Sequence, residues 1–154
     1  TCGVVPRIYE LMNLNLQLTL TISLHAPNDE IRSNTMPINN KYKIDELLAV
    51  CRKYGEKTGR RVSFEYTLIK DVNDSKENAL ELAAQLKGMN AHVNLIPVND
   101  VKERGNIKSS KKAILNFQNI LKKNGINATI RRTLGADINA SCGQLRRLKN
   151  RGEN

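Results

Sequence analysis

Four segments of the chain have the pattern of hydrophobic and polar positions that is typical of β-strands. In these segments apolar side chains alternate with Thr or Ser, or follow one another in a short run bounded by turn residues. The segments are residues 16–24, 61–69, 92–97 and 128–131. The opening residues, from Thr1 to Pro6, are typical of a turn that leaves a further strand.

Apolar residues recur at helical spacing between the predicted strands. The first predicted helix ends at Gly59 and the third at Gly125, since glycine tolerates the left-handed backbone that ends a helix. A turn over 70–74 leads into the second, which Asp74 or Ser75 caps, and Ser109 or Ser110 opens the third. The inward residues of the three helices include Ile44, Leu47, Leu48, Cys51, Tyr54, Leu82, Ala83, Leu86, Ile114, Phe117 and Leu121.

The order of these elements predicts an α/β fold. Strands and helices alternate with connections too long for hairpins, which indicates about four parallel strands joined by right-handed crossover helices. A closed (β/α) barrel needs about 200 residues or more. With 154 residues the chain is expected to form an open sheet or, as we prefer, half of a barrel.

Length and composition indicate one soluble domain. Hydrophobic residues make up 40% and charged residues 26%, which excludes collagen-like and fully disordered chains. No apolar run approaches the roughly 18 residues of a membrane span, and no secretory signal opens the chain. We therefore expect no membrane contact and a cytoplasmic location. Because the sequence does not begin with Met, we interpret residues 1–154 as a piece of a longer protein.

The positive charge is concentrated in the last third of the chain. The net charge is +10, yet residues 1–101 hold 12 basic and 12 acidic residues, against 13 basic and three acidic in residues 102–154. A patch that faces phosphates explains this split better than lysines scattered over a solvated surface. We therefore predict an RNA partner. The residues expected to contact it are Lys102, Arg104, Arg146 and Arg147.

The three cysteines are too few and too far apart for a disulfide framework, and none belongs to a CxxC pair. Cys51 lies on the apolar stripe of a helix and is interpreted as core. Cys142 stands in a small, polar segment with arginines on both sides, and nearby cations favour a thiolate. Composition alone leaves Cys142 open between a reactive and a structural role.

In parallel α/β folds functional residues gather beyond the carboxyl ends of the strands. His92 begins the third strand and falls at the opposite end, where we expect a structural role. The residues expected at the carboxyl ends include Ser23, Leu24, His25, Asn99, Arg131 and Arg132. Chemistry that depends on GxGxxG, GxxxxGK[ST], HExxH or GxSxG is excluded, because none of these motifs occurs.

Five motifs in series closely resemble the radical-SAM adenine-C2 methyltransferases of bacterial ribosomal and transfer RNA, the RlmN family. The resemblance runs over essentially the whole chain, in order and at the family's spacing. The motifs are Ser23-Leu24-His25-Ala26-Pro27-Asn28, Met36-Pro37-Ile38-Asn39, Phe64-Glu65-Tyr66, Val93-Asn94-Leu95-Ile96-Pro97-Val98-Asn99 and Asp137-Ile138-Asn139-Ala140-Ser141-Cys142-Gly143-Gln144-Leu145.

The resemblance implies the C-terminal half of a radical-SAM partial (β/α) barrel. It implies that S-adenosylmethionine (SAM) is contacted by Ser23, Leu24, His25 and Asn99. It further implies that Cys142, in a C-terminal segment over 133–154, becomes methylated and passes the methyl group to C2 of adenine in 23S rRNA and tRNA. Radical chemistry is needed because adenine C2 is not nucleophilic, and the cofactors supply it.

The chain departs from the family in one respect. The CxxxCxxC motif that holds the 4Fe-4S cluster lies upstream in the family and is absent here. We therefore expect no metal ligands in this chain, a cluster and its electron donor only for the full-length protein, and no activity for the 154 residues alone. Two alternatives remain open: a related enzyme that methylates adenine C8, and a non-catalytic RNA-binding half-barrel. Half a barrel also leaves open sheet edges, through which we expect the chain to self-associate.

Overall fold

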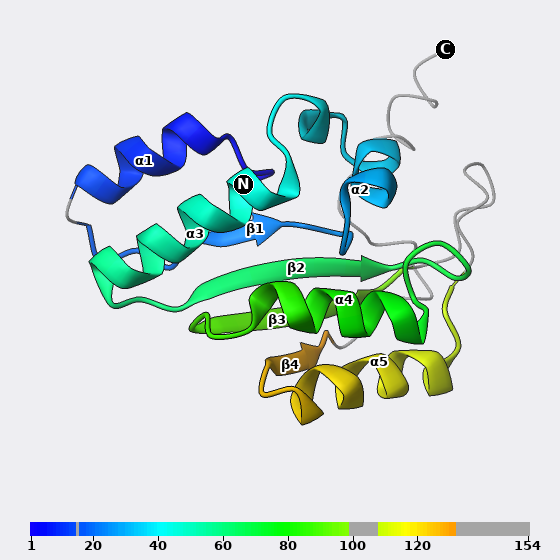
Figure 1. Cartoon of the computed structure of the whole chain (residues 1–154). Coiled ribbons are helices and arrows are strands. Elements are labelled where there is room, and N and C mark those ends of the chain that lie inside the picture. Colours follow the sequence, from blue (N-terminus) through cyan, green and yellow to red (C-terminus); the bar gives the residue numbers. More distant parts are fainter. Residues whose placement is uncertain (15, 99–107, 132–154) are drawn as a thin grey trace, which may run out of the picture.

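The computed structural model describes residues 1–14, 16–98 and 108–131 (Figure 1). In these ranges the chain forms one sheet of four parallel strands in the order β1-β2-β3-β4. The strands are β1 (Thr21–Ser23), β2 (Val62–Leu68), β3 (Ala91–Pro97) and β4 (Asn127–Ile130). The predicted parallel α/β sheet is confirmed. No helix in the described ranges is long and apolar enough to cross a bilayer.

Three helices connect successive strands, as the sequence predicted. They are α3 (Ile44–Thr58), α4 (Lys76–Leu86) and α5 (Lys111–Lys123). Gly59 ends α3 in the left-handed conformation, with φ 66°. Ser75 and Ser110, rather than the neighbouring candidates, cap α4 and α5 by accepting hydrogen bonds from the N–H groups of Asn78 and Ala113.

The segments around β1 differ from the prediction. The strand covers only Thr21–Ser23, and Leu16 and Leu18, which the sequence placed in it, are 50% and 44% exposed. Three helical segments were not predicted: α1 (Val5–Asn13), α2 (Asp29–Thr35) and the 3-10 helix η1 (Pro37–Asn40). Pro6 occupies the first turn of α1, where its missing N–H costs nothing.

The two faces of the sheet differ in character. On β2, Val62, Phe64, Tyr66 and Leu68 are fully buried, and the rings of Tyr66 and Phe117 of α5 lie 5.1 Å apart. Figure 1 shows α3, α4 and α5 on one side of the sheet, which is this apolar face. The alternate positions on β2 are half-buried polar residues. They form a second face, which we call the polar face.

Strand register places four polar residues side by side on the polar face. Ser23 of β1 pairs with Glu65 of β2, Glu65 with Asn94 of β3, and Asn94 with Thr129 of β4. We call these four residues the polar row. It crosses the whole sheet near the carboxyl end of β1.

β1 and β4 are the outer strands of the sheet. The backbone of Thr1 lies along the outer edge of β1: its amino group donates to the Thr21 carbonyl at 2.9 Å, and Ser23 N–H donates to the Thr1 carbonyl at 2.8 Å. The residues that follow Thr1 turn into α1 instead of continuing along the sheet.

Candidate functional site

The segment Ser23–His25 leaves the sheet at the carboxyl end of β1, where the sequence predicted it. All of its backbone polar groups are hydrogen-bonded within the protein. The N–H groups of Leu24 and His25 both donate to the Glu65 carbonyl, at 3.1 and 3.2 Å, and Ser23 N–H donates to Thr1. The carbonyls of this segment accept hydrogen bonds from the side chains of Arg32 and Asn73. The segment is therefore held rigidly without the help of a ligand.

Arg32 of α2 is fully buried, although a guanidinium is rarely so. It donates to the carbonyl of Leu24 at 3.1 Å, of Cys2 at 2.8 Å and of Ser23 at 3.3 Å, and to Asn39 Oδ1 at 3.0 Å. Burial lowers the pKa of Arg32. Carbonyl dipoles rather than a bonded carboxylate thus compensate the cation, and they lock the backbone of the predicted ligand segment.

Asn39 explains why the Met36–Asn39 motif sits beside this segment. Its amide donates to Asp29 Oδ1 and Ser33 Oγ, each at 2.9 Å, while its oxygen holds Arg32. Asp29 Oδ1 also accepts from the N–H of Ile44, at the start of α3. Burial opposes the charged form of Asp29, but the hydrogen bonds from Ile44 and Asn39 favour it, and the net result is a lowered pKa. The network joins α2, η1 and α3 behind Ser23–His25.

His25 has an unusual backbone and a defined ring. Its φ is 59°, in the left-handed region that residues with a Cβ rarely adopt. Ring atom Nδ1 accepts a hydrogen bond from Thr67 N–H at 3.1 Å. Burial lowers the pKa of His25; the nearby carboxylate of Glu65 opposes the shift and the cation of Arg32 adds to it. The ring is therefore held in its neutral form.

Asn73 ties the same segment to the end of β2. It is fully buried, and its amide donates at 2.8 Å to the carbonyls of both His25 and Thr67. Its side-chain oxygen accepts from Ile69 N–H at 2.7 Å, and its carbonyl accepts from the Tyr66 hydroxyl at 2.8 Å. The side chain thus replaces the strand partner that β2 lacks beyond the end of β1.

Three members of the polar row, Glu65, Asn94 and Thr129, are hydrogen-bonded to one another through their side chains. Asn94 donates to the Glu65 carboxylate, at 3.1 Å to Oε2 and 3.3 Å to Oε1, and Thr129 donates to Asn94 Oδ1 at 3.5 Å. Thr129 Oγ1 also lies 3.0 Å from Nε2 of His92. His92 pairs with Ser63 and lies toward the amino end of the sheet, as predicted. A carboxylate thus lies next to Ser23 on the polar face.

Two side-chain atoms of the segment remain for a ligand. Ser23 Oγ and His25 Nε2 have no hydrogen-bond partner among the described residues, and neither belongs to their buried unpartnered atoms. Leu24, in contrast, is fully buried and packs in the core. The face of the segment that a ligand can reach therefore consists of a hydroxyl and an imidazole.

The other residues that the sequence analysis singled out lie partly inside and partly outside the described ranges. Cys51 is fully buried, which confirms it as core, and burial raises the pKa of its thiol to about 12. Arg131 is exposed, and its N–H donates to the Leu95 carbonyl. Outside the described residues lie Asn99, Lys102, Arg104, Arg132, Cys142, Arg146 and Arg147.

Helix α5 carries much of the positive charge of the last third of the chain, as far as the structure describes it. Lys111 and Lys112 lie in its first turn and Lys122 and Lys123 in its last, all exposed and all without an acidic residue on the helix. Cations are unfavourable in a first turn, because the helix dipole is positive there. The first turn follows the connection from β3, so Lys111 and Lys112 lie toward the carboxyl edge of the sheet.

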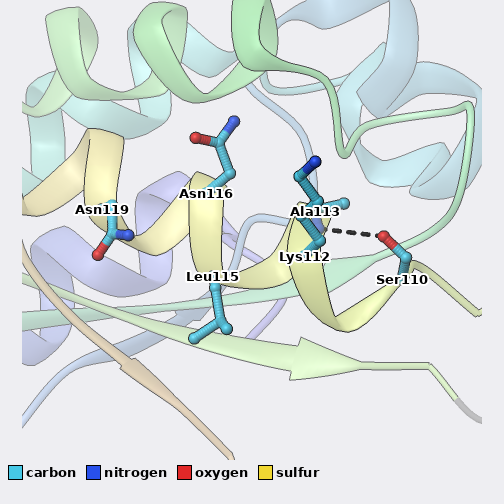
Figure 2. A pocket seen from close by; sticks show the side chains of 6 residues that line it. All are labelled: Ser110, Lys112, Ala113, Leu115, Asn116 and Asn119. Atoms are coloured by element: carbon cyan, nitrogen blue, oxygen red, sulfur yellow. Dashed lines mark hydrogen bonds between the residues drawn. The ribbon is translucent and has the colours of Figure 1, made fainter.

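Helix α5 carries a hollow that none of the residues Ser23–His25 lines, and Figure 2 shows the side chains that do. Figure 2 shows the hydrogen bond from Ala113 N–H to Ser110 Oγ at the start of the helix. No polar-row residue lines the hollow. It is lined by Ser110, Lys112, Ala113, Leu115, Asn116 and Asn119.

The arrangement fits one implied cofactor and not the other. A free hydroxyl, a neutral imidazole and a nearby carboxylate suit a polar, cationic ligand such as SAM. Within residues 1–14, 16–98 and 108–131 no group of three or more His, Cys, Asp or Glu side chains could hold a metal ion. The described residues therefore do not fit an iron–sulfur cluster.

Sequence reasoning missed most of the residues whose hydrogen bonds fix the position of the Ser23–His25 segment. Asn39 and Asn94 had a signal only as members of the quoted motifs, whereas Glu65 was also expected near the carboxyl end of the second predicted strand. Asn73 lies in the predicted turn over 70–74, where asparagine is common for local reasons. Arg32 gave no signal, because three of its four partners are backbone carbonyls, up to 30 residues away.

Comparison with known proteins identifies close relatives. No protein-family model matches the chain. The chain is 59% identical, over 95% of its length, to a probable dual-specificity RNA methyltransferase RlmN from Lachnospira eligens. A crystal structure of a radical SAM methyltransferase from Sphaerobacter thermophilus superposes with a TM-score of 0.89 over 94% of the chain, at 50% identity. The resemblance to these enzymes is confirmed.

The same comparisons define what is shared. The chain covers 42% of the Lachnospira protein and 42% of the Sphaerobacter chain, so it spans about two fifths of the length of these relatives. A domain of a pyruvate-formate lyase-activating enzyme from Bacteroides vulgatus superposes with a TM-score of 0.67 at 20% identity, a likeness of fold alone. The sheet is thus a radical-SAM type partial barrel.

Proposed function

We propose that this chain is the SAM-binding part of a longer radical-SAM RNA methyltransferase, which methylates C2 of adenine in 23S rRNA and tRNA. The observation that carries the proposal is the Ser23–His25 segment. Its backbone is fully bonded, its Ser23 Oγ and His25 Nε2 have no hydrogen-bond partner among the described residues, and it lies in a chain that is 59% identical to a probable RNA methyltransferase. Acting on these RNAs, the protein would work in the cytoplasm.

Ser23 and His25 would hold SAM with their side chains. Leu24, which is buried, would contribute through its backbone, and Asn99 would complete the set after β3. When bound, SAM supplies an electrophilic methyl group. The Glu65 carboxylate accepts a hydrogen bond from Asn94 and lies beside Ser23 on the polar face of the sheet. Its negative charge favours a cationic ligand there.

Cys142 is the proposed carrier of the methyl group. Adenine C2 does not act as a nucleophile, so the base cannot take a methyl cation directly, whereas a thiolate can. Cys51 is unsuited to this role, because it is fully buried and its pKa is raised to about 12. The segment 133–154, with Cys142 between basic residues, would bring the thiol and the RNA together.

RNA would be held mainly through its phosphates. Lys102, Arg104, Arg146 and Arg147 are the proposed contacts, and such contacts dock the RNA while leaving base selection to the pocket. The described residues supply no cluster ligands. The proposal therefore assigns the 4Fe-4S cluster and its electron donor to the full-length protein, and we expect the 154 residues alone to be inactive.

The test is the identity of the methylated carbon. Ribosomal and transfer RNA from cells with and without the full-length gene would be digested to nucleosides and analysed by mass spectrometry. We expect 2-methyladenosine that disappears with the gene and returns with a plasmid copy. 8-Methyladenosine would instead assign the enzyme to the C8 class. Unchanged methylation at both carbons would refute the proposal.

A further inference from the structure

We propose that Asn73 is a positioning residue that acts through His25, and that it presents the imidazole to SAM as a hydrogen-bond donor at Nε2. The inference rests on the proposed SAM site and deepens it. It assigns a role to a buried side chain outside the Ser23–Asn28 motif and specifies which kind of ligand atom His25 contacts.

The backbone of His25 needs external support. A left-handed φ of 59° is unfavourable for a residue with a Cβ and persists only where its surroundings enforce it. Two hydrogen bonds enforce it on the main chain: His25 N–H donates to the Glu65 carbonyl at 3.2 Å, and the His25 carbonyl accepts from Asn73 at 2.8 Å. Of these two partners only Asn73 acts through a side chain, so it can be removed by mutation.

The ring of His25 is fixed in one tautomer. Thr67 N–H can only donate, so Nδ1, which lies 3.1 Å from it, must be the unprotonated nitrogen. The proton of the neutral ring is then on Nε2. This atom has no partner among the described residues and is not one of their buried unpartnered atoms. His25 therefore offers a ligand a donor, and the matching atom of SAM is an acceptor: a ring nitrogen, a hydroxyl or a carboxylate oxygen.

Asn73 holds both the residue that carries the ring, His25, and the residue whose N–H bonds to it, Thr67. Its amide donates to the carbonyl of His25 and to the carbonyl of Thr67, the residue whose N–H fixes the ring. Its side-chain oxygen accepts from Ile69 N–H at 2.7 Å, and its surface is fully buried. One rigid side chain thus sets the distance between the ring and the N–H group that selects its tautomer.

The charged groups that face His25 are Glu65 and Arg32. Burial lowers the pKa of His25, which keeps the ring neutral near neutral pH. Protonation at Nδ1 would set two donors, the ring N–H and Thr67 N–H, against each other. Acid should therefore release the ring from its position and weaken SAM binding.

A double-mutant cycle tests whether Asn73 acts through His25. SAM binding to the full-length protein is measured by calorimetry for wild type, Asn73→Ala, His25→Asn and the double variant. Asparagine tolerates the left-handed backbone, so His25→Asn removes the ring and keeps the fold. We expect each single variant to bind SAM about tenfold more weakly. We expect the double variant to match His25→Asn within about twofold.

Three results would overturn the inference. They are wild-type affinity in Asn73→Ala, losses that multiply in the double variant, and SAM affinity in the wild type that stays unchanged as the pH is lowered well below 6.5, where the His25 ring takes up its proton. The pH profile uses only wild-type protein, so it still tests the donor role of His25 Nε2 if Asn73→Ala does not fold. Asn78→Ala is the matched control, because Asn78 serves only the cap of α4 and should lower stability without changing SAM affinity. If the wild type binds no SAM at all, the proposed function fails instead.

Discussion

Arg32 Nε donates to the carbonyl oxygen of Leu24 at 3.1 Å, from a side chain with no exposed surface. The same guanidinium reaches the carbonyls of Cys2 and Ser23 and the amide oxygen of Asn39. A cation placed in this way joins α2 to the residues on both sides of β1. The proposed ligand segment therefore depends on a residue that never touches the ligand.

Arg32→Met should destabilise the protein. The variant keeps an unbranched side chain of moderate length but leaves the carbonyls of Cys2 and Leu24 without that donor. We expect the free energy of unfolding to fall by about 3 kcal/mol. Urea unfolding followed by circular dichroism measures it. Arg7→Met is the control, because Arg7 is exposed on α1 and should change little. Equal losses in the two variants would contradict the role of Arg32.

Cys51 should be chemically inert in the folded protein. Its pKa is raised to about 12 by burial, so almost no thiolate forms near neutral pH. We expect iodoacetamide to leave Cys51 unmodified until denaturant is added, as read by peptide mass spectrometry. Cys51→Ala should keep methylation and cost about 1 kcal/mol or more of stability through a small cavity. Loss of methylation in a folded Cys51→Ala protein would show that we assigned the wrong cysteine.

Stability should fall in mild acid because of the two histidines. Burial is the main cause that lowers the pKa of His25 and of His92 below 6.5. Between the lowered pKa and 6.5 the unfolded chain binds protons that the folded chain excludes. This contribution to stability is thus fully present above pH 6.5 and is lost as the pH falls toward the folded pKa.

Thermal unfolding across this pH range measures the effect. The melting temperature of the wild type should drop as the pH is lowered from above 6.5, and the drop should be smaller in the variant His25→Asn with His92→Gln. The lowered pKa of Asp29 acts in a separate window below 3.8. The same drop in wild type and double variant would assign the acid sensitivity to other groups.

The basic last third should hold RNA by its phosphates. Neutralising Lys102, Arg104, Arg146 and Arg147 in the full-length protein should weaken RNA binding and reduce its log–log salt slope by roughly one per lost contact. SAM affinity should stay the same. Filter binding at several salt concentrations measures this.

Helix α5 provides a matched pair of controls for the same assay. Lys111→Gln with Lys112→Gln removes charge at the end of α5 that lies toward the carboxyl edge of the sheet, and Lys122→Gln with Lys123→Gln removes the same charge at the far end. We expect only the first pair to reduce the slope. If the variant without the charges of Lys102, Arg104, Arg146 and Arg147 binds RNA with unchanged affinity and salt slope, the basic third is merely a solvated surface.

The 154-residue chain on its own should self-associate. The outer strands β1 and β4 each have one side without a strand partner in the described part, apart from the backbone of Thr1 on β1. Unpaired N–H and C=O groups on such edges recruit other strands. Light scattering at increasing concentration should show dimers or larger species. A compact, thermally stable monomer at high concentration would contradict this expectation.

The crossover units could be predicted because their signals are local. Ile44 and Cys51 recur at helical spacing and Gly59 ends that helix, so α3 could be predicted. The serines at 109 and 110 likewise indicated where α5 begins. The first strand was overestimated, because the alternation from Leu16 onward persists in residues that remain exposed. α1 was missed because Pro6 was interpreted as part of a turn, although proline also fits the first turn of a helix.

The site was predictable only in part, for a physical reason. The carboxyl end of a parallel strand has a known place, so Ser23 and His25 could be located before the structure was seen. The support from Arg32 and Asn73 could not be predicted, because both bond mainly to backbone groups, which have no sequence signature. Three-dimensional contacts alone reveal such partners.

The most direct measurement of the central claim is the methylation state of Cys142. Full-length protein would be incubated with SAM that carries an isotopically labelled methyl group and then digested for tandem mass spectrometry. We predict one labelled methyl group on the sulfur of Cys142, none on Cys51, and no RNA methylation by the Cys142→Ala variant. An unlabelled Cys142 in a protein that methylates RNA, or full activity of Cys142→Ala, would contradict the account.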